Sequence, residues 1–222
     1  MAQVRGHAVT AAEYLSPTIP TGLTWRDLPV VDATDPVVAE LAFTFAGDPR
    51  DVEVPIVPWP DTGGRPLDPG TGVGGGVVEG IFRCTWRGDR LMAVNEAVDG
   101  AYVLGFATRP EDAADERDAP VEHVYLWHVN AHPDGGQLFS SLDGRPFLVP
   151  AIPAGPDPDM KRAVVIRSDG ATGVCLLPGV WHDGVYPETG DGEYLTRQGA
   201  VHARISCDLG AEFGWLPRFA LG

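Results

Sequence analysis

Three polar side chains, His132, Gln137 and His182, follow short apolar segments of this 222-residue sequence. Imidazole nitrogens titrate near neutral pH and bind borderline divalent metals, and an amide oxygen can complete a set of three or four ligands. We therefore predict that these three residues are catalytic. We also regard them as the candidate ligands of one divalent ion, such as Zn, Ni or Mn. The alternative is that the three side chains only hydrogen-bond to one another.

His132 ends a segment that has the period of a β-strand. From Val124 onward the residues alternate, and Val124, Leu126, His128, Asn130 and His132 share one face. A strand whose face becomes polar toward one end is typical of a cavity lining. We predict that Asn130 binds substrate, whereas His128 is either a satisfied interior histidine or part of the site.

Turns accompany both histidine-bearing segments. The first segment continues through a Pro-Asp-Gly-Gly turn at residues 133–136 to Gln137. The second runs from Gly173 as a short apolar strand, then through the turn Pro178-Gly179, to Trp181 and His182. Trp181 is either a core residue or a side chain that contacts substrate.

The two segments resemble the two halves of the cupin signature. The first half reads Asn130-x-His132, then Gln137 and Gly144, with one histidine and the acid of the signature replaced. The second half ends in Pro178-Gly179-x-x-His182. Within the cupins the sequence is similar to the ureidoglycolate lyase family over about residues 121–219. The matching residues are His132, Pro133, Gln137, Phe147, Val149, Gly173, Val174, Trp181 and His182. That family usually has Glu at the position of Asn130.

This resemblance implies an all-β fold, a cupin-type jelly-roll β-barrel with a few short helices. It also implies a lyase that splits ureidoglycolate, or a related small carboxylated carbinolamide, into glyoxylate and urea, as in allantoin degradation and purine catabolism. Because paired barrels are usual in cupins, a homodimer is expected. Two other functions stay open: a metal-dependent cupin oxygenase or isomerase acting on a small acid, and a non-catalytic cupin that binds a small molecule.

A substrate with a carboxylate needs a cationic partner, and a guanidinium can bind a carboxylate through two parallel hydrogen bonds. Arg204 and His202 share one face of the predicted strand Val201–Asp208, and we predict that both bind substrate. The alternative is that this face is the solvent side of an edge strand.

The rest of the chain fits one domain over residues 1–222. Its 28 Gly and 21 Pro, together with about nine strand-like segments, favour a β-sandwich or barrel. Helices are expected at Ala11–Leu15 and Asp35–Leu41, with Asp35 as the N-cap. The glycine-rich run at residues 70–76 lacks the Lys-Ser/Thr of a phosphate-binding loop and is predicted to be a loop. Asp99-Gly100 predicts a two-residue hairpin turn.

The net charge of −15 argues against binding to nucleic acid or to an anionic membrane surface. No apolar run approaches the ~20 residues that a membrane-spanning helix needs. The three cysteines, Cys84, Cys175 and Cys207, have no metal-type spacing and cannot all pair. We therefore expect a soluble cytoplasmic protein with reduced thiols.

Overall fold

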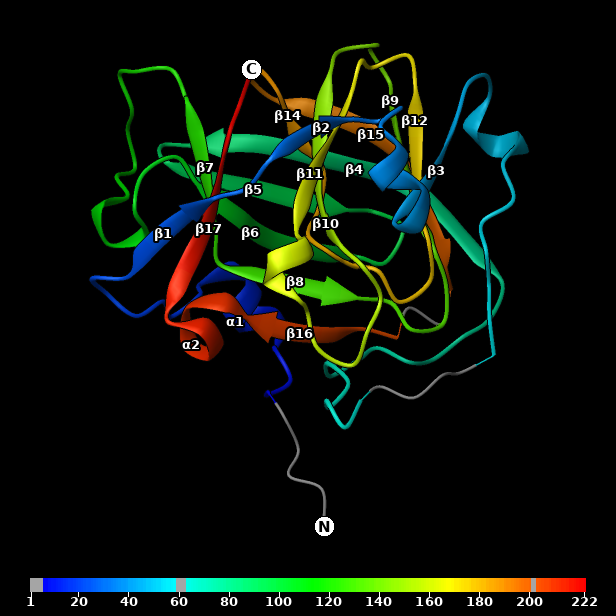
Figure 1. Ribbon diagram of the computed structural model, residues 1–222, viewed down its shortest axis with the longest axis horizontal. Coiled ribbons are helices and arrows are strands. Elements are labelled where there is room, and N and C mark those ends of the chain that lie inside the picture. The colour runs from blue at the N-terminus through cyan, green and yellow to red at the C-terminus, as the bar shows by residue number, and fades with distance from the viewer. Residues whose placement is uncertain (1–5, 59–62, 201–202) are drawn as a thin grey trace.

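A computed structural model describes residues 6–58, 63–200 and 203–222, and within them the strands form two sheets (Figure 1). In spatial order, the ten-stranded sheet contains β1 (Thr24–Asp27), β17 (Trp215–Ala220), β7 (His123–Leu126), β6 (Gly100–Phe106), β5 (Arg90–Asn95), β4 (Val77–Arg87), β15 (Gly192–Gly199), β9 (Gln137–Ser141), β12 (Gly173–Leu176) and β3 (Ala42–Phe45). The seven-stranded sheet contains β16 (Ile205–Asp208), β8 (His128–Ala131), β13 (Trp181–His182), β10 (Phe147–Ile152), β11 (Val164–Ser168) and β2 (Val30–Asp32), and β14 (Tyr186–Pro187) pairs with β10.

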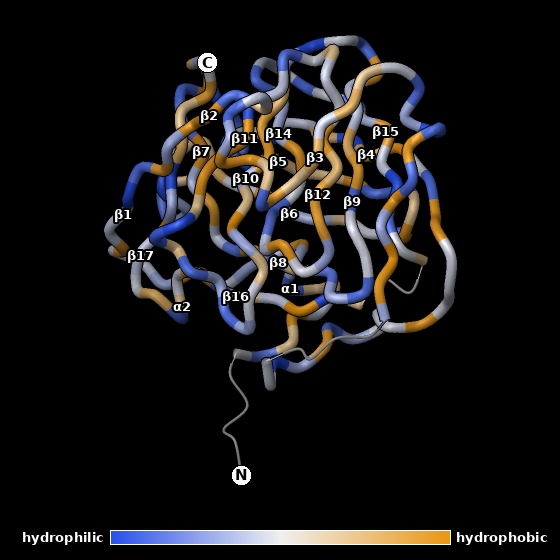
Figure 2. Tube along the Cα trace, turned by 45° about the vertical axis from the view of Figure 1, so that its right-hand side comes forward, coloured by the Kyte–Doolittle hydropathy of each residue, from blue (hydrophilic) through white to orange (hydrophobic). Residues whose placement is uncertain are grey.

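The sheets pack face to face, with β8, β10 and β11 in front of β4, β5 and β6 in Figure 1. Apolar side chains from both sheets form the core between them, and the largest fully buried ones include Trp181, Phe139 and Phe147. In Figure 2 the central strands, β12 among them, are predominantly hydrophobic. The predicted all-β, cupin-like fold is confirmed, although the strands form two sheets and not a closed barrel.

Helices are short. The described residues contain α1 (Ala11–Leu15), α2 (Leu209–Phe213) and four 3-10 turns: η1 (Pro36–Glu40), η2 (Pro49–Asp51), η3 (Pro110–Asp112) and η4 (Met160–Arg162). The predicted helix at residues 11–15 is confirmed, and Thr10 and Glu13 cap it reciprocally. Asp35 is an N-cap as predicted, but the segment that follows is a 3-10 helix. None of the helices that the structure describes has the length and apolar character needed to cross a membrane.

Two predicted strand boundaries were wrong. The segment from Val124 to His132 is not one strand, because the chain leaves the larger sheet at Leu126 and joins the smaller one at His128. At this crossing the Trp127 indole donates a hydrogen bond to the carbonyl of Val103. The predicted two-residue hairpin is instead a four-residue turn, since β5 ends at residue 95 and β6 begins at residue 100.

One buried carboxylate, Asp68, connects the N-terminal helix α1 to the sheets. The residue is 1% exposed. Its Oδ1 accepts a hydrogen bond from the backbone N–H of Val9 at 2.8 Å. Its Oδ2 accepts from Nε of Arg204 at 2.7 Å and from the hydroxyls of Ser206 at 2.6 Å and Tyr14 at 3.2 Å. Asp68 therefore ties α1 to the strand β16 near the other end of the chain.

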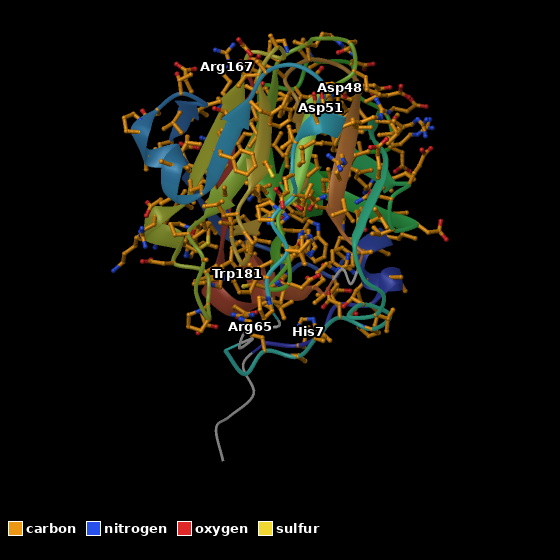
Figure 3. The ribbon with its side chains drawn as sticks, turned by 90° about the vertical axis from the view of Figure 1, so that its right-hand side faces the viewer. His7, Asp48, Asp51, Arg65, Arg167 and Trp181 are labelled. Atoms are coloured by element: carbon orange, nitrogen blue, oxygen red, sulfur yellow. The ribbon has the colours of Figure 1, made fainter. Side chains whose placement is uncertain are left out.

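A second buried ion pair lies close by, at the end of the molecule that is opposite Asp48 and Asp51 in Figure 3. Arg65 donates hydrogen bonds to Asp157 and Glu212, and its guanidinium carbon lies 5.1 Å from the centre of the Trp181 ring. Figure 3 shows Arg65 beside Trp181, so this ion pair covers the outer side of the core at that end.

We expect Asp68→Ala to lower the free energy of unfolding by about 3–5 kcal/mol, because it leaves the buried guanidinium of Arg204 without its counter-charge. For a chain of this size, the melting temperature should fall by roughly 10 °C. The matched control is Asp27→Ala, since Asp27 pairs with Arg218 but its side chain is 63% exposed. Exposed pairs contribute little. Equal shifts for the two variants would show that Asp68 does not hold the N-terminal segment.

Candidate active site

Polar side chains from both sheets line one cavity between them. The larger sheet contributes residues of β4, β5, β6 and β9, and the smaller sheet contributes residues of β8 and β13. The lining residues are Tyr14, Phe82, Asn95, Tyr102, Leu104, His128, Asn130, His132, Gln137, His182, Asp183, Gly184 and Arg204. Of the seven predicted site residues, five line this cavity: Asn130, His132, Gln137, His182 and Arg204.

Gln137 stands between the two histidines. Its Oε1 lies 3.1 Å from Nε2 of His132 and 3.1 Å from Nε2 of His182, and the two imidazole centroids are 5.1 Å apart. All three side chains are at least 95% buried. Gln137 comes from β9 of the larger sheet, whereas the histidines come from β13 and from the end of β8 in the smaller sheet. The site therefore exists only where the two sheets face each other.

Backbone carbonyls fix the tautomer of both imidazoles. Nδ1 of His182 lies 2.8 Å from the carbonyl oxygen of Val180, and Nδ1 of His132 lies 3.2 Å from that of Ala203. A carbonyl oxygen only accepts, so each Nδ1 carries a proton, and in the neutral form of each ring the lone pair is on Nε2. Burial lowers the pKa of His182 to about 4, so this ring is neutral at pH 7.

The orientation of the Gln137 amide follows from a chain of hydrogen bonds that begins at a backbone N–H. Ala97 donates its N–H to Oδ1 of Asn95 at 3.1 Å, which turns the Asn95 amide nitrogen toward Gln198. The oxygen of Gln198 accepts from Asn95 at 2.9 Å and from Nε2 of Gln137 at 3.1 Å. Oε1 of Gln137 must therefore face the histidines. Gly80 leaves room for this chain, because a Cβ there would lie 2.3 Å from the Ala97 nitrogen.

When both rings are neutral, three lone pairs converge on one point, from two imidazoles and one amide. Lone pairs repel unless a proton or a metal ion lies between them, and metal-bound histidines commonly donate their other N–H to a backbone carbonyl in this way. The described residues contain no group of three or more His, Cys, Asp and Glu that could hold a metal. An ion at this position would therefore rest on His132, His182 and Gln137, and this donor set suits a borderline divalent metal.

Arg204 is buried at the same cavity, which excludes the alternative of a solvent-facing strand surface. Its guanidinium carbon lies 4.2 Å from the ring centre of Tyr14 and 5.6 Å from that of Tyr102, and its Nε is bound to Asp68. Its Nη1 makes one long contact of 3.5 Å with the Tyr102 hydroxyl. The guanidinium thus retains N–H groups for an anion in the cavity.

Trp181, another predicted substrate contact, does not line the cavity. Trp181 is completely buried in the core and donates its indole N–H to the carbonyl of Gly155, so its assignment as a substrate contact is corrected to the core interpretation. His202 lies outside the described residues.

Sequence reasoning missed several lining residues. Asn95 and Asp183 are polar residues in strand or turn segments, and Tyr14 lies in the predicted helix Ala11–Leu15; none of the three had a further signal. Asp183 directly follows His182, and burial raises its pKa to about 7. His128 does line the cavity, and burial together with the charge of Arg204 lowers its pKa well below the usual range. Only the fold reveals that these groups share one site.

The family model described as ureidoglycolate lyase matches residues 88–208, which is more than half of the chain. The chain belongs to this family. The matched range includes the two histidines, Gln137 and Arg204, but neither Tyr14 nor Asp68.

Curated proteins named ureidoglycolate lyase are similar to part of the chain. One from Azotobacter vinelandii strain DJ is 39% identical over 74 residues, which are 32% of this chain and 45% of that protein. One from Pseudomonas putida strain F1 is 39% identical over 69 residues, 31% of this chain and 40% of that protein. One from Stutzerimonas stutzeri strain A1501 is 43% identical over 54 residues, 24% of this chain and 32% of that protein. The chain thus matches less than half the length of each of these relatives.

We expect Gln137→Glu to bind a divalent ion more tightly, by about tenfold or more, because a carboxylate adds a charged ligand. The same change should lower the melting temperature of the metal-free protein, since a carboxylate cannot donate to Gln198. Titration of chelator-treated protein with Zn²⁺, Ni²⁺ and Mn²⁺ gives the affinities. Gln198→Glu is the matched control, because it adds the same charge one hydrogen bond away from the ligand position. An equal gain in both variants would mean that Gln137 is not a ligand.

Proposed function

We propose that this protein is a ureidoglycolate lyase-like enzyme that cleaves ureidoglycolate, or a related carboxylated carbinolamide, to glyoxylate and urea. The observation that carries the proposal is one buried cavity that combines two imidazoles with an arginine. His132, His182 and Arg204 supply a base for a hydroxyl proton and a cation for a carboxylate. Membership of the family and the names of the partial relatives support the lyase function over the oxygenase, isomerase and non-catalytic alternatives.

The reaction breaks the bond between the carbinol carbon and a urea nitrogen. A base removes the proton from the carbinol hydroxyl, the C–O bond becomes a carbonyl, and the electron pair of the C–N bond leaves with the nitrogen, which takes up a proton. His132 or His182 acts as the base through its Nε2 lone pair, since each Nδ1 is bound to a backbone carbonyl. Arg204 holds the carboxylate and thereby aligns the hydroxyl with the imidazoles.

His132, His182 and Gln137 are the residues that would hold a divalent metal such as Zn, Ni or Mn. Bound there, the ion would polarise the hydroxyl and the carboxylate of the substrate. Gln137 has a second role that needs no metal, because its oxygen separates the two imidazoles and keeps both Nε2 atoms directed at one point.

The setting of the enzyme is also part of the proposal. We propose a cytoplasmic homodimer that acts on a small carboxylated substrate in allantoin degradation and purine catabolism, and that binds neither nucleic acid nor membranes. The free, buried cysteines Cys84, Cys175 and Cys207 support a reducing compartment. The net charge of −15 argues against polyanionic partners.

We expect His132→Ala and His182→Ala each to lower kcat for ureidoglycolate by about 10²–10⁴-fold, the contribution of a positioned proton-transfer group. The double variant should cost little more, because residues that act as a unit are not additive. Release of glyoxylate and urea measures turnover, and circular dichroism checks the fold. His123→Ala, on β7 outside the cavity, is the matched control. Near-parental turnover by both folded single variants would place the site elsewhere.

Arg204→Lys should raise KM by roughly tenfold with a smaller change in kcat, because an ammonium cannot make two parallel hydrogen bonds to the carboxylate. Arg218→Lys is the matched control, since Arg218 also combines an aspartate with aromatic neighbours but lies outside the cavity. If Arg204→Lys leaves both constants unchanged, Arg204 serves the fold through Asp68 and does not bind substrate.

A further inference from the structure

The cavity contains a second group of polar atoms that the proposed proton transfer does not use. Oδ1 of Asp183, Oδ1 of Asn130 and both ring nitrogens of His128 are buried, and none has a hydrogen-bond partner among the described residues. All three side chains line the cavity that contains Arg204. Buried polar atoms without partners are destabilising and uncommon in folded proteins, so three such side chains in one cavity indicate a ligand.

Asp183 and Asn130 each present a hydrogen-bond acceptor. The Asp183 side chain is 1% exposed and its Oδ2 is bound to the hydroxyl of Tyr186, which also contacts the carbonyl of Leu104 at 3.0 Å. In the ionised carboxylate, Oδ2 accepts from Tyr186 and Oδ1 is an acceptor without a partner among the described residues. Asn130 donates its amide nitrogen to the carbonyl of His182 at 3.2 Å, which leaves its oxygen as the second acceptor.

His128 supplies a donor beside these acceptors. A neutral imidazole has one N–H and one acceptor nitrogen. The ring is held between Trp127, with centroids 4.5 Å apart, and Tyr14, with centroids 4.9 Å apart. Its Nδ1 lies 3.5 Å from Oδ1 of Asp183, which is too long for a good hydrogen bond. The ring is thus fixed in place while its nitrogens stay available.

We infer that Asp183, Asn130 and His128 form a subsite for a planar group with several N–H donors and one carbonyl oxygen, namely a primary amide or a urea. The two acceptor oxygens take the N–H groups and the imidazole N–H binds the carbonyl oxygen. An ammonium group fits less well, because it has donors only and leaves the His128 N–H unpaired. This inference rests on the proposed function and identifies the part of the cavity that holds the ureido group.

Two non-reactive analogues test the subsite in the intact protein. Hydantoate (N-carbamoylglycine) and N-acetylglycine have the same carboxylate and the same secondary amide, but hydantoate ends in NH₂ where N-acetylglycine ends in CH₃. Neither has the carbinol hydroxyl, so neither is cleaved. Isothermal titration of the parental protein should show hydantoate binding about tenfold more tightly, the effect of one or two additional hydrogen bonds.

Variants assign that preference to the subsite. Asp183→Leu should abolish it, whereas Asp183→Asn should retain it, since the amide can donate to Tyr186 and keep an oxygen at the position of Oδ1. Arg204→Lys should weaken both analogues by the same factor. Asp89→Asn, at a buried aspartate outside the cavity, should change neither affinity. If circular dichroism shows that Asp183→Leu is unfolded, Asn130→Ala replaces it and should also reduce the preference.

The possible outcomes separate the subsite from the proposed function. Equal affinities for the two analogues in the parental protein, or a preference that survives in folded Asp183→Leu, would overturn the subsite while ureidoglycolate turnover still stands. If neither analogue binds and ureidoglycolate is not cleaved, both the subsite and the proposed function are wrong. A preference for hydantoate that Asp183→Leu removes and Asp183→Asn retains supports the subsite.

Discussion

Polar groups that are buried between two apolar sheets cannot exchange their hydrogen-bond partners for water. Whether the nearest backbone group is a donor or an acceptor therefore decides how each polar group is oriented. The N–H of Ala97 can only donate, and through Asn95 and Gln198 it turns the oxygen of Gln137 toward the histidines. The carbonyls of Val180 and Ala203 can only accept, and they turn both Nε2 lone pairs toward that oxygen. The chemistry available at the centre of the cavity is therefore set by the backbone of both sheets. The proton on each Nδ1 is therefore in place before any ligand enters.

Alternation and turn composition predicted most strands, because these depend on neighbours in sequence. The resemblance to the two halves of the cupin signature predicted the mutual approach of His132, Gln137 and His182, which are up to 50 residues apart. Sequence could not show that the chain changes sheet at Trp127. The strands on either side, β7 and β8, are both largely buried, so their apolar patterns look alike. Nor could the sequence show that Asn95 orients Gln137 through Gln198, which lies 103 residues away along the chain. The position of Asp183 in the cavity likewise depends on how the two sheets pack together. The two candidate histidines were thus visible in the sequence, whereas the groups that orient Gln137 between them were not.

The segment before the family domain takes part in the cavity. Tyr14 covers one face of the Arg204 guanidinium, and Asp68 neutralises it from the side. Both residues lie outside the range that the family model matches. The family model alone therefore cannot show how this chain surrounds Arg204. The environment of Arg204 therefore depends in part on residues that the family model does not include.

The edge of the larger sheet joins the two ends of the chain, because β1 pairs in parallel with β17. Asp27 and Arg218, which bridge these strands, are 191 residues apart. At ribosomal rates of about 5–20 residues per second, β1 waits on the order of 10–40 s for its partner strand to be synthesised. The Asp68–Arg204 contact must wait in the same way, across 136 residues. The cavity can thus close only after Arg204 has been synthesised, and β1 lacks its partner strand until β17 has been made.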